Sequence, residues 1–230
     1  MTTISGIVQS APPGAKGFDV NTPISTSAAK QFLARGYRFC LRYVGRLTTR
    51  PGDLTQAEAQ NIVNAGLALM VVQHVKSDHD WTPDGALGTT YGANAALFSQ
   101  QAGIPPRVNV WLDLEGVAPG TPAEDVIAYC ENWYRGVADA GYVPGLYVGD
   151  QPGLTGRQLY DLSFQHYWGA SNVNNDVKPA CDWCLRQRSA SGGTIAGVST
   201  DWYDDDFTQT DNAGRTVQWL VSPEHAAPTA

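Results

Sequence analysis

The stretch Asn109-Val110-Trp111-Leu112-Asp113-Leu114-Glu115-Gly116 decides how this chain is built. Its apolar residues alternate with Trp111, Asp113 and Glu115, and this period of two predicts a short β-strand. Two acids spaced in this way lie about 6.5–7 Å apart along a strand and point in the same direction. Burial and mutual repulsion penalise both charges, so we expect one carboxyl to keep its proton while the other stays ionised. The alternative is a strand end whose acids reach solvent or pair with Arg and Lys.

Length and composition favour one globular domain. The chain has 230 residues, of which 43% are hydrophobic and 16% charged, so there is ample material for a packed core. The net charge of −7 argues against sequence-independent nucleic-acid binding, which needs clustered cations. No apolar run approaches the roughly 20 residues that cross a bilayer. Residues 1–16 lack the charged start and apolar centre of a standard secretory signal.

The four cysteines give no clear sign of a disulfide framework. Cys40 and Cys130 lie in apolar segments, and we expect both to be buried free thiols. Cys181 and Cys184 have the spacing of a redox pair or of half a zinc site. Because no second pair of ligands completes four zinc ligands, a local disulfide or two free thiols is the better interpretation.

Strand and helix signals alternate along most of the chain. Pro122 marks the start of one helix, Ser25 or Thr26 caps another and Thr55 begins a third. The expected strands span residues 17–20, 37–44, 67–75, 109–115, 143–149, 166–171, 184–189 and 198–207.

About eight strands with helical crossovers predict an α/β fold, a single (β/α)8 TIM-like barrel over residues 17–222. Helices are expected to be irregular or missing in the C-terminal third. Residues 1–16 would form a lead segment and 223–230 a loose tail, while Thr216–Val221 would be a final strand or a tail element. No glycine-rich dinucleotide loop or P-loop follows any strand, so we predict no nucleotide cofactor, and indeed no cofactor of any kind.

Active sites of such barrels lie at the carboxyl ends of the strands. Asp19 ends the first expected strand, while Asp113 and Glu115 end the fourth. The last barrel strand carries Asp201, Asp204, Asp205 and Asp206, and it neighbours the first strand in a closed parallel barrel. We therefore expect Asp19 to lie beside one of these aspartates. Such a cluster suits the protonation of a leaving oxygen.

Aromatic residues at other strand ends would form faces for sugar rings. Tyr43, Tyr147 and Trp168 are the candidates, although most aromatic residues of a domain serve its core. Arg42 and Arg46 lie near the same mouth. Arg42 would either neutralise the acids or, if it pairs with Asp113, leave the pKa of the second acid raised.

Several of these segments also carry a family resemblance. Gly17-Phe18-Asp19-Val20, Trp111-Leu112-Asp113-Leu114-Glu115, Leu146-Tyr147-Val148 and Tyr167-Trp168-Gly169-Ala170 resemble the family-25 glycoside hydrolases, the lysozyme-type muramidases. The chain is similar also to their bacterial relatives, the glycoside-hydrolase-like domain family of unknown function numbered 1906, through its opening and Phe39-Cys40-Leu41-Arg42-Tyr43-Val44. The likeness spans roughly residues 17–207.

The resemblance implies roles for particular residues. Glu115 would be the proton donor, Asp113 would orient the substrate N-acetyl group or stabilise charge, and Asp19 would complete the cluster. The Trp-Gln pair of the muramidases is replaced here by Arg186-Gln187, which leaves Gln187 as a substrate-binding candidate alongside Arg42 and the aromatic residues. Asp204 best matches the single aspartate on their last strand, with a shift of one residue.

The leading hypothesis is a monomeric hydrolase of a β-linked, N-acetylated glycan of the peptidoglycan type, acting outside the cytoplasm. A second is a barrel that binds wall glycan without cleaving it. The third is a metal-dependent hydrolase that uses His74, Asp78, His79 and Asp80, but the spacing of the two histidines departs from known zinc motifs. We therefore predict that the site holds no metal.

Overall fold

The computed structural model describes residues 2–189, 194–199 and 203–226, and within them eight strands close into a barrel. Around the barrel the strands are β2 (Lys16–Val20), β3 (Phe39–Val44), β4 (Ala68–Gln73), β5 (Asn109–Leu114), β6 (Val143–Val148), β7 (His166–Gly169), β8 (Leu185–Arg188) and β11 (Tyr203–Thr208). Residues at β4 and β5 pair directly and complete the ring. The predicted TIM-like α/β barrel is therefore confirmed.

Five α-helices lie outside this ring: α1 (Thr26–Ala34), α2 (Gln56–Asn64), α3 (Gly85–Gln101), α4 (Ala123–Asp139) and α5 (Gly156–Tyr160). Side chains of Ser25, Thr55, Asp84 and Thr155 cap four of them by accepting a backbone N–H from the first turn. The capping predictions at Ser25 and Thr55 are confirmed, and Asp84 is a further cap, at the start of α3.

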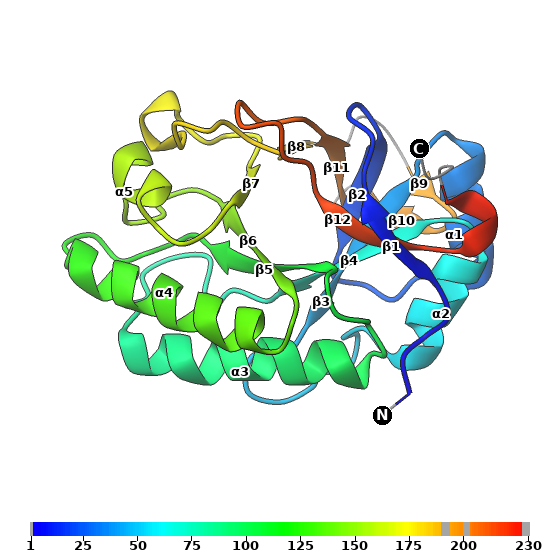
Figure 1. Ribbon diagram of the computed structural model, residues 1–230, viewed down its shortest axis with the longest axis horizontal. Coiled ribbons are helices and arrows are strands. Elements are labelled where there is room, and N and C mark those ends of the chain that lie inside the picture. The colour runs from blue at the N-terminus through cyan, green and yellow to red at the C-terminus, as the bar shows by residue number, and fades with distance from the viewer. Residues whose placement is uncertain (1, 190–193, 200–202, 227–230) are drawn as a thin grey trace.

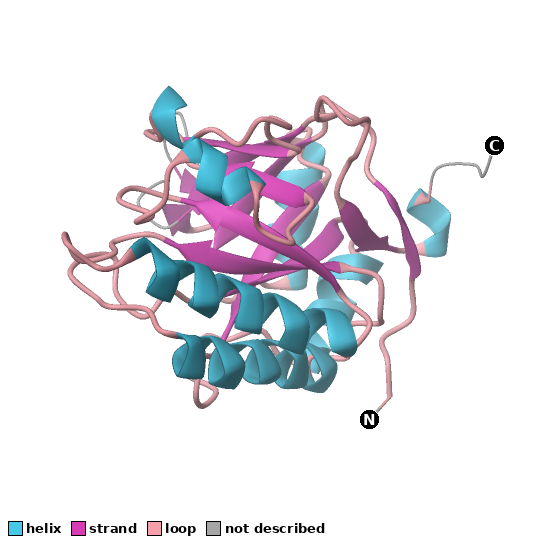
Figure 2. Cartoon of the chain, turned by 60° about the vertical axis from the view of Figure 1, so that its left-hand side comes forward, coloured by secondary structure: helices cyan, strands magenta, loops and turns pink. Residues whose placement is uncertain are grey.

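The helices cover only part of the barrel wall. Figure 1 shows α3 and α4 side by side along one flank and α1 and α2 along another, while none of the described α-helices lies over the outer side of β8. Figure 2 shows the two long helices stacked outside the strands. They approach closely because Gly88 and Gly92 face the α4 backbone, where a Cβ would lie 2.2 Å from the Tyr129 carbonyl oxygen and 2.5 Å from that of Trp133. Beyond Tyr160 the described residues form no α-helix, in agreement with the expected irregular or missing helices of the C-terminal third.

The direction of the last barrel strand differs from the prediction of a wholly parallel barrel. β2 to β8 pair in parallel, but β11 runs antiparallel to both β2 and β8. The expected strand over residues 198–207 is also divided, since β10 (Val198–Ser199) pairs instead with β9 (Thr194–Ile195). The described residues between β8 and β11 form the β9–β10 pair rather than a crossover helix, and a crossover is what a parallel arrangement of successive strands needs.

Two antiparallel strands from opposite ends of the chain pair with each other at the amino-terminal end of the barrel. β1 (Ile7–Ser10), in the segment where the sequence indicated only a lead, pairs antiparallel with β12 (Gln218–Val221), and Leu220 of β12 pairs with Leu69 of β4. The Trp219 ring packs 5.6 Å from the ring of Phe39, which comes from β3. The predicted final strand over residues 216–221 is confirmed, and the expected loose tail begins with a 3-10 helix, η2 (Pro223–His225).

All four cysteines are buried free thiols, which confirms the prediction for Cys40 and Cys130 and places Cys181 and Cys184 among unpaired thiols. Within the described part of the chain, every helix is too short or too polar to cross a membrane.

Arg42 corrects an expectation, because it does not face the barrel mouth. Its side chain is fully buried on the outer side of β3, where Nε donates to Glu58 Oε1 at 2.8 Å and Nη2 donates to the Gly52 carbonyl at 2.8 Å. A further hydrogen bond reaches the Val20 carbonyl at the end of β2. Arg42 therefore ties β3 to β2, to the following loop and to α2, and it neutralises none of the mouth acids.

We predict that Arg42→Met lowers the free energy of unfolding by about 3–5 kcal/mol, because it leaves Glu58 buried without its partner. Arg42→Met combined with Glu58→Met should recover much of this loss. Arg38→Met, at an exposed arginine just before the same strand, serves as the control and should change stability by less than about 0.5 kcal/mol. Denaturant unfolding measures all three; an Arg42→Met variant of parental stability would contradict the structural role.

Candidate active site

Asp19 anchors one side of the barrel mouth from the end of β2. Its Oδ2 accepts a hydrogen bond from Gln187 Nε2 at 2.9 Å, and its Oδ1 accepts one from the Tyr43 hydroxyl at 3.1 Å. Gln187 in turn accepts a hydrogen bond from the Tyr147 hydroxyl at 3.0 Å. Four predicted site residues from four strands are thus joined in one chain of hydrogen bonds, with Asp19 at its centre.

Burial dominates the acidity of Asp19. It raises the pKa of this carboxyl from 3.8 to about 6, although the hydrogen bond from Gln187 opposes the shift and the charge of Asp204 adds to it. Burial likewise raises the pKa of Tyr43 and Tyr147, so both phenols stay protonated and act as donors. Asp19 is therefore held in place by neutral groups.

Asp113 and Glu115 lie across the mouth, at the end of β5. Asp113 is 5% exposed, and its Oδ1 is buried without a hydrogen-bond partner among the described residues. Burial, followed by the charge of Glu115, raises the pKa of Asp113 well above its usual value. Glu115 is half-buried, and burial together with the charges of Asp78, Asp19 and Asp150 raises its pKa from 4.5 to about 7. The pair thus keeps a proton at neutral pH.

The backbone around Glu115 leaves room for its carboxyl group. A Cβ on Gly149 would lie 2.3 Å from Glu115 Oε2, so only glycine fits beside the carboxyl at the end of β6. Gly116, with φ of +64°, follows directly, and a Cβ there would overlap the Asp78 backbone. The Trp81 indole donates to the Glu115 carbonyl at 2.6 Å. These contacts fix the turn that presents Glu115 at the strand end.

The aspartates of β11 alternate between the two sides of the barrel wall. Asp204 lies opposite Asp19 in the register, and Asp206 lies opposite Gly17, so both share the inner side with Asp19. Asp205 points outward, where it binds the Tyr37 hydroxyl at 2.7 Å and Lys16 at 2.9 Å. The expected neighbour of Asp19 is thus Asp204, while Asp201 lies outside the described residues.

Asp206 is a deeper carboxyl that the sequence did not single out. It is fully buried, and neither of its oxygens makes a hydrogen bond of normal geometry with a described residue. Burial, and then the charges of Asp19 and Asp204, raise its pKa well above the usual value. The antiparallel direction of β11 explains its depth, because residues later in this strand lie farther from the mouth. The sequence signal for this residue is the i, i+2 spacing of Asp204 and Asp206, which places both carboxyls on the same side of a strand.

Aromatic rings line the inside of the barrel beneath these acids. Trp168 packs 4.5 Å from the Tyr147 ring and 5.8 Å from the Trp111 ring, measured between centroids. Trp168 and Trp111 are almost fully buried, whereas Tyr43 is half-buried and stacks at 4.8 Å on His74. Tyr43 and Tyr147 therefore lie at the level of the acids, and Trp168 supports Tyr147 from below.

Cations are kept away from this cluster. Among the described residues, no Lys or Arg forms an ion pair with Asp19, Asp113, Glu115 or Asp206. Arg46, the other arginine near this end of β3, lies over the Tyr91 ring at 5.4 Å. The raised pKa values follow from this separation, since a neighbouring cation would lower them.

The residues of the metal hypothesis do not converge. His74 Nε2 lies 2.9 Å from Asp53 Oδ1, whereas His79 pairs with Asp78 on the exposed loop at 2.7 Å. In the part of the chain that the structure describes, no group of three or more His, Cys, Asp or Glu side chains is arranged to hold a metal ion.

Three bacterial proteins are among the solved structures of similar fold. The Mycobacterium tuberculosis Tat-secreted protein Rv2525c, crystallised with L-tartrate, is 16% identical, with a TM-score of 0.64 over 89% of this chain and 99% of that one. The bacterial lysozyme from Streptomyces coelicolor is 16% identical, with a TM-score of 0.57 over 88% and 95%. The Clostridium perfringens spore cortex lytic enzyme SleM is 16% identical, with a TM-score of 0.59 over 87% and 68%.

At these identities the structural similarity shows the fold alone. No curated protein matches the sequence. A family model, however, matches residues 30–212, which include β3 to β11 and all of the mouth acids except Asp19. This match agrees with the resemblance carried by the sequence motifs. The chain belongs to the family described as the Rv2525c-like, glycoside hydrolase-like domain.

Proposed function

We propose that this protein hydrolyses a β-linked glycan of N-acetylated sugars, namely peptidoglycan, and that Glu115 is the proton donor. The observation that carries the proposal is the raised pKa of Glu115, about 7, at a barrel mouth where other carboxyls surround it and no described cation pairs with it. A carboxylic acid that keeps its proton near neutral pH is what the cleavage of a glycosidic bond requires. Muramidases and a spore cortex lytic enzyme are among the proteins of similar fold.

In this mechanism Glu115 donates its proton to the glycosidic oxygen as the bond to the anomeric carbon breaks. Positive charge then develops on the sugar ring, and Asp19, which a pKa of about 6 leaves ionised at neutral pH, stabilises it electrostatically beside its neighbour Asp204. Water, or the acetamido group of the substrate, attacks the anomeric carbon from the opposite face. Asp113, next to Glu115, orients that acetamido group, while burial and the charges of Asp78, Asp19 and Asp150 raise the pKa of the donor.

The half-buried Tyr43 would bind a sugar ring and Tyr147 would border it, whereas Trp168 is 1% exposed and can only support Tyr147. Tyr147 also fixes Gln187, whose amide holds Asp19 in position. Arg42 takes no part, because its side chain is on the outer side of β3. Such a site acts on cell-wall material outside the cytoplasm, and one protein of similar fold is itself Tat-secreted.

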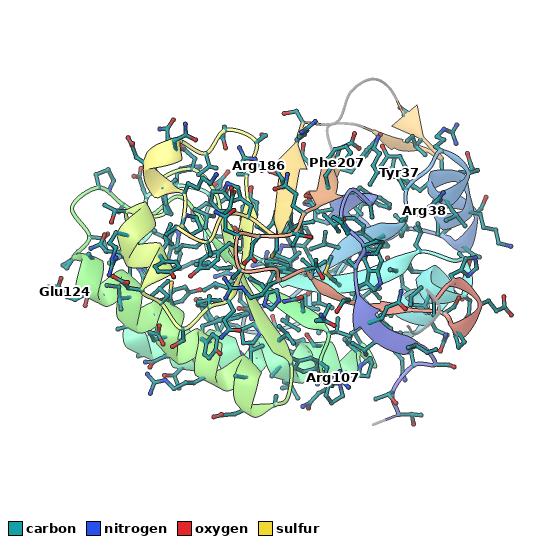
Figure 3. The ribbon with its side chains drawn as sticks, turned by 45° about the horizontal axis from the view of Figure 1, so that its top comes forward. Tyr37, Arg38, Arg107, Glu124, Arg186 and Phe207 are labelled. Carbon is teal, nitrogen blue, oxygen red and sulfur yellow. The ribbon has the colours of Figure 1, made fainter. Side chains whose placement is uncertain are left out.

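We predict that Glu115→Gln lowers the release of soluble fragments from purified peptidoglycan by about 10²–10⁴-fold, because the amide cannot donate the proton. Mass analysis of the soluble fraction identifies the fragments and the bond cleaved. Glu124→Gln, at an exposed glutamate of α4, is the matched control and should keep parental activity. Glu124 lies far to one side of the molecule in Figure 3. Parental turnover by Glu115→Gln would refute the assignment, and wall binding without new reducing ends would favour a binding barrel instead.

The pH dependence of hydrolysis tests the same assignment. Because Glu115 must be protonated, kcat/KM should fall about tenfold per pH unit above a pKa of about 7. Asp78→Asn removes the charge that contributes most, after burial, to the raised pKa of Glu115, so the alkaline limb of its profile should move to lower pH. An alkaline limb that stays in place in Asp78→Asn would show that the limb does not report the ionisation of Glu115.

The cluster should also lower stability as the pH rises. The folded-state pKa values of Asp19 and Glu115 are raised to about 6 and about 7, so the folded protein binds protons more tightly than the unfolded chain. For these two groups alone, stability is therefore greatest below about pH 4. As the pH rises, each carboxyl lowers the free energy of unfolding by up to about 1.4 kcal/mol per pH unit, until the pH passes its folded-state pKa. Asp113→Asn should weaken this decline and unfold at higher denaturant concentration than the parent at pH 8. A less stable variant at pH 8 would contradict the electrostatic cost.

A further inference from the structure

The outer side of β8 carries a pocket that the proposed hydrolysis does not use. It has a volume of about 550 Å³ and lies on the wall that no α-helix covers. Polar and charged side chains predominate in its lining: Ser171, Asn175, Lys178, Asp182, Trp183, Arg186, Gln187, Arg188, Ser189 and Gln209. Figure 3 shows Arg186 and Phe207 close together on this wall.

Two arginines supply the charge of this pocket. Arg186 and Arg188 are alternate residues of one strand, so their side chains leave the same side of the sheet about 6.5–7 Å apart. Gln187, between them, points into the barrel and binds Asp19. The pocket is thus separated from the mouth acids by the thickness of the strand.

Aromatic rings hold both guanidinium groups in place. Arg186 lies over the Trp183 ring at 5.6 Å, and Arg188 lies over the Phe207 ring at 5.0 Å. Stacking on a ring occupies a face of the planar guanidinium and leaves the N–H groups along its edge for an oxyanion. Nη1 of Arg186 has no hydrogen-bond partner among the described residues, and this group is buried.

The two arginines have no ion-pair partner in the part of the chain that the structure describes. None of the ion pairs formed by the described residues includes Arg186 or Arg188. Asp205, opposite Arg188 in the register, already uses one oxygen for Tyr37 and the other for Lys16. Asp182 forms an ion pair with Lys178, four residues earlier in the chain. Burial, and then the charge of Arg188, lower the pKa of Arg186 and outweigh the opposing charge of Asp182.

We propose that this pocket is a binding site for an oxyanion, in which Arg186 and Arg188 together bind a ligand that carries phosphate or carboxylate groups. The chain as a whole has a net charge of −7, and the barrel mouth is acidic, so an anion is repelled there and attracted here. The spacing of the two arginines matches a ligand with two anionic groups, or a short anionic polymer, better than a single small ion. Donors on Ser171, Asn175 and Gln209 border the same space.

Isothermal titration calorimetry with pyrophosphate, inorganic phosphate and succinate tests the proposal at constant ionic strength. We expect saturable binding of pyrophosphate or succinate, tighter than that of inorganic phosphate, and the better ligand of the two distinguishes a phosphate source from a carboxylate source. Saturable binding of none of the three would overturn the proposal.

Variants locate the site. Arg188→Gln, at an exposed side chain, should weaken binding about tenfold or more, and Arg186→Gln with Arg188→Gln should abolish it. Arg107→Gln with Arg135→Gln removes the same charge from exposed positions elsewhere and should leave binding unchanged. Arg107 lies at the opposite edge of the molecule in Figure 3. Thermal unfolding of each variant establishes that it is folded.

Glu115→Gln separates this site from the proposed active site. This variant should lose hydrolysis but bind the anion as the parent does. Arg188→Gln should still release soluble fragments from purified peptidoglycan. Equal binding by the parent and by Arg188→Gln would overturn the proposal, and so would loss of anion binding in Glu115→Gln.

Discussion

The alternation of side chains along the barrel strands is the constraint on which the charge distribution depends. Each strand presents successive residues to opposite sides of the wall, so a strand that turns one acid inward turns its neighbours outward. On β11 this places Asp204 and Asp206 inside and Asp205 outside. On β8 it places Gln187 inside and both arginines outside. Carboxyls therefore gather within the barrel while the cations of the same strands remain on its outer surface.

The interior cluster is stable only because neutral groups surround it. Gln187 and Tyr43 hold Asp19 by hydrogen bonds, and Tyr147 holds Gln187. These contacts fix the geometry without adding positive charge, so burial continues to raise the pKa values of the acids. A lysine or arginine in the same place would stabilise the fold and would also remove the neutral carboxylic acid. A cation at the mouth would therefore favour stability, whereas the proposed chemistry requires that none is there.

The reversed strand β11 shapes both sides of this wall. Inside the barrel, its direction places Asp204 near the mouth and Asp206 deeper, so acids at two levels lie beside Asp19. Outside, the described residues between β8 and β11 form the β9–β10 pair rather than a crossover helix that would cover β8. The uncovered surface exposes the stacked arginines and forms the polar pocket. One change in topology therefore accounts for the deep acid and for the open outer wall.

The sequence alone determined much of this structure, because its signals are local. The order of residues was enough to predict the strand over residues 109–115, the caps at Ser25 and Thr55, and the missing late helices. The tertiary structure decided the direction of β11 and the orientation of Arg42. Arg42 and Tyr43 are adjacent on a strand, so only one of them can face the mouth, and the buried carboxylate of Glu58 on α2 decides which. The depth of Asp206 likewise follows from strand pairing, a contact between segments far apart in the chain that no local pattern encodes.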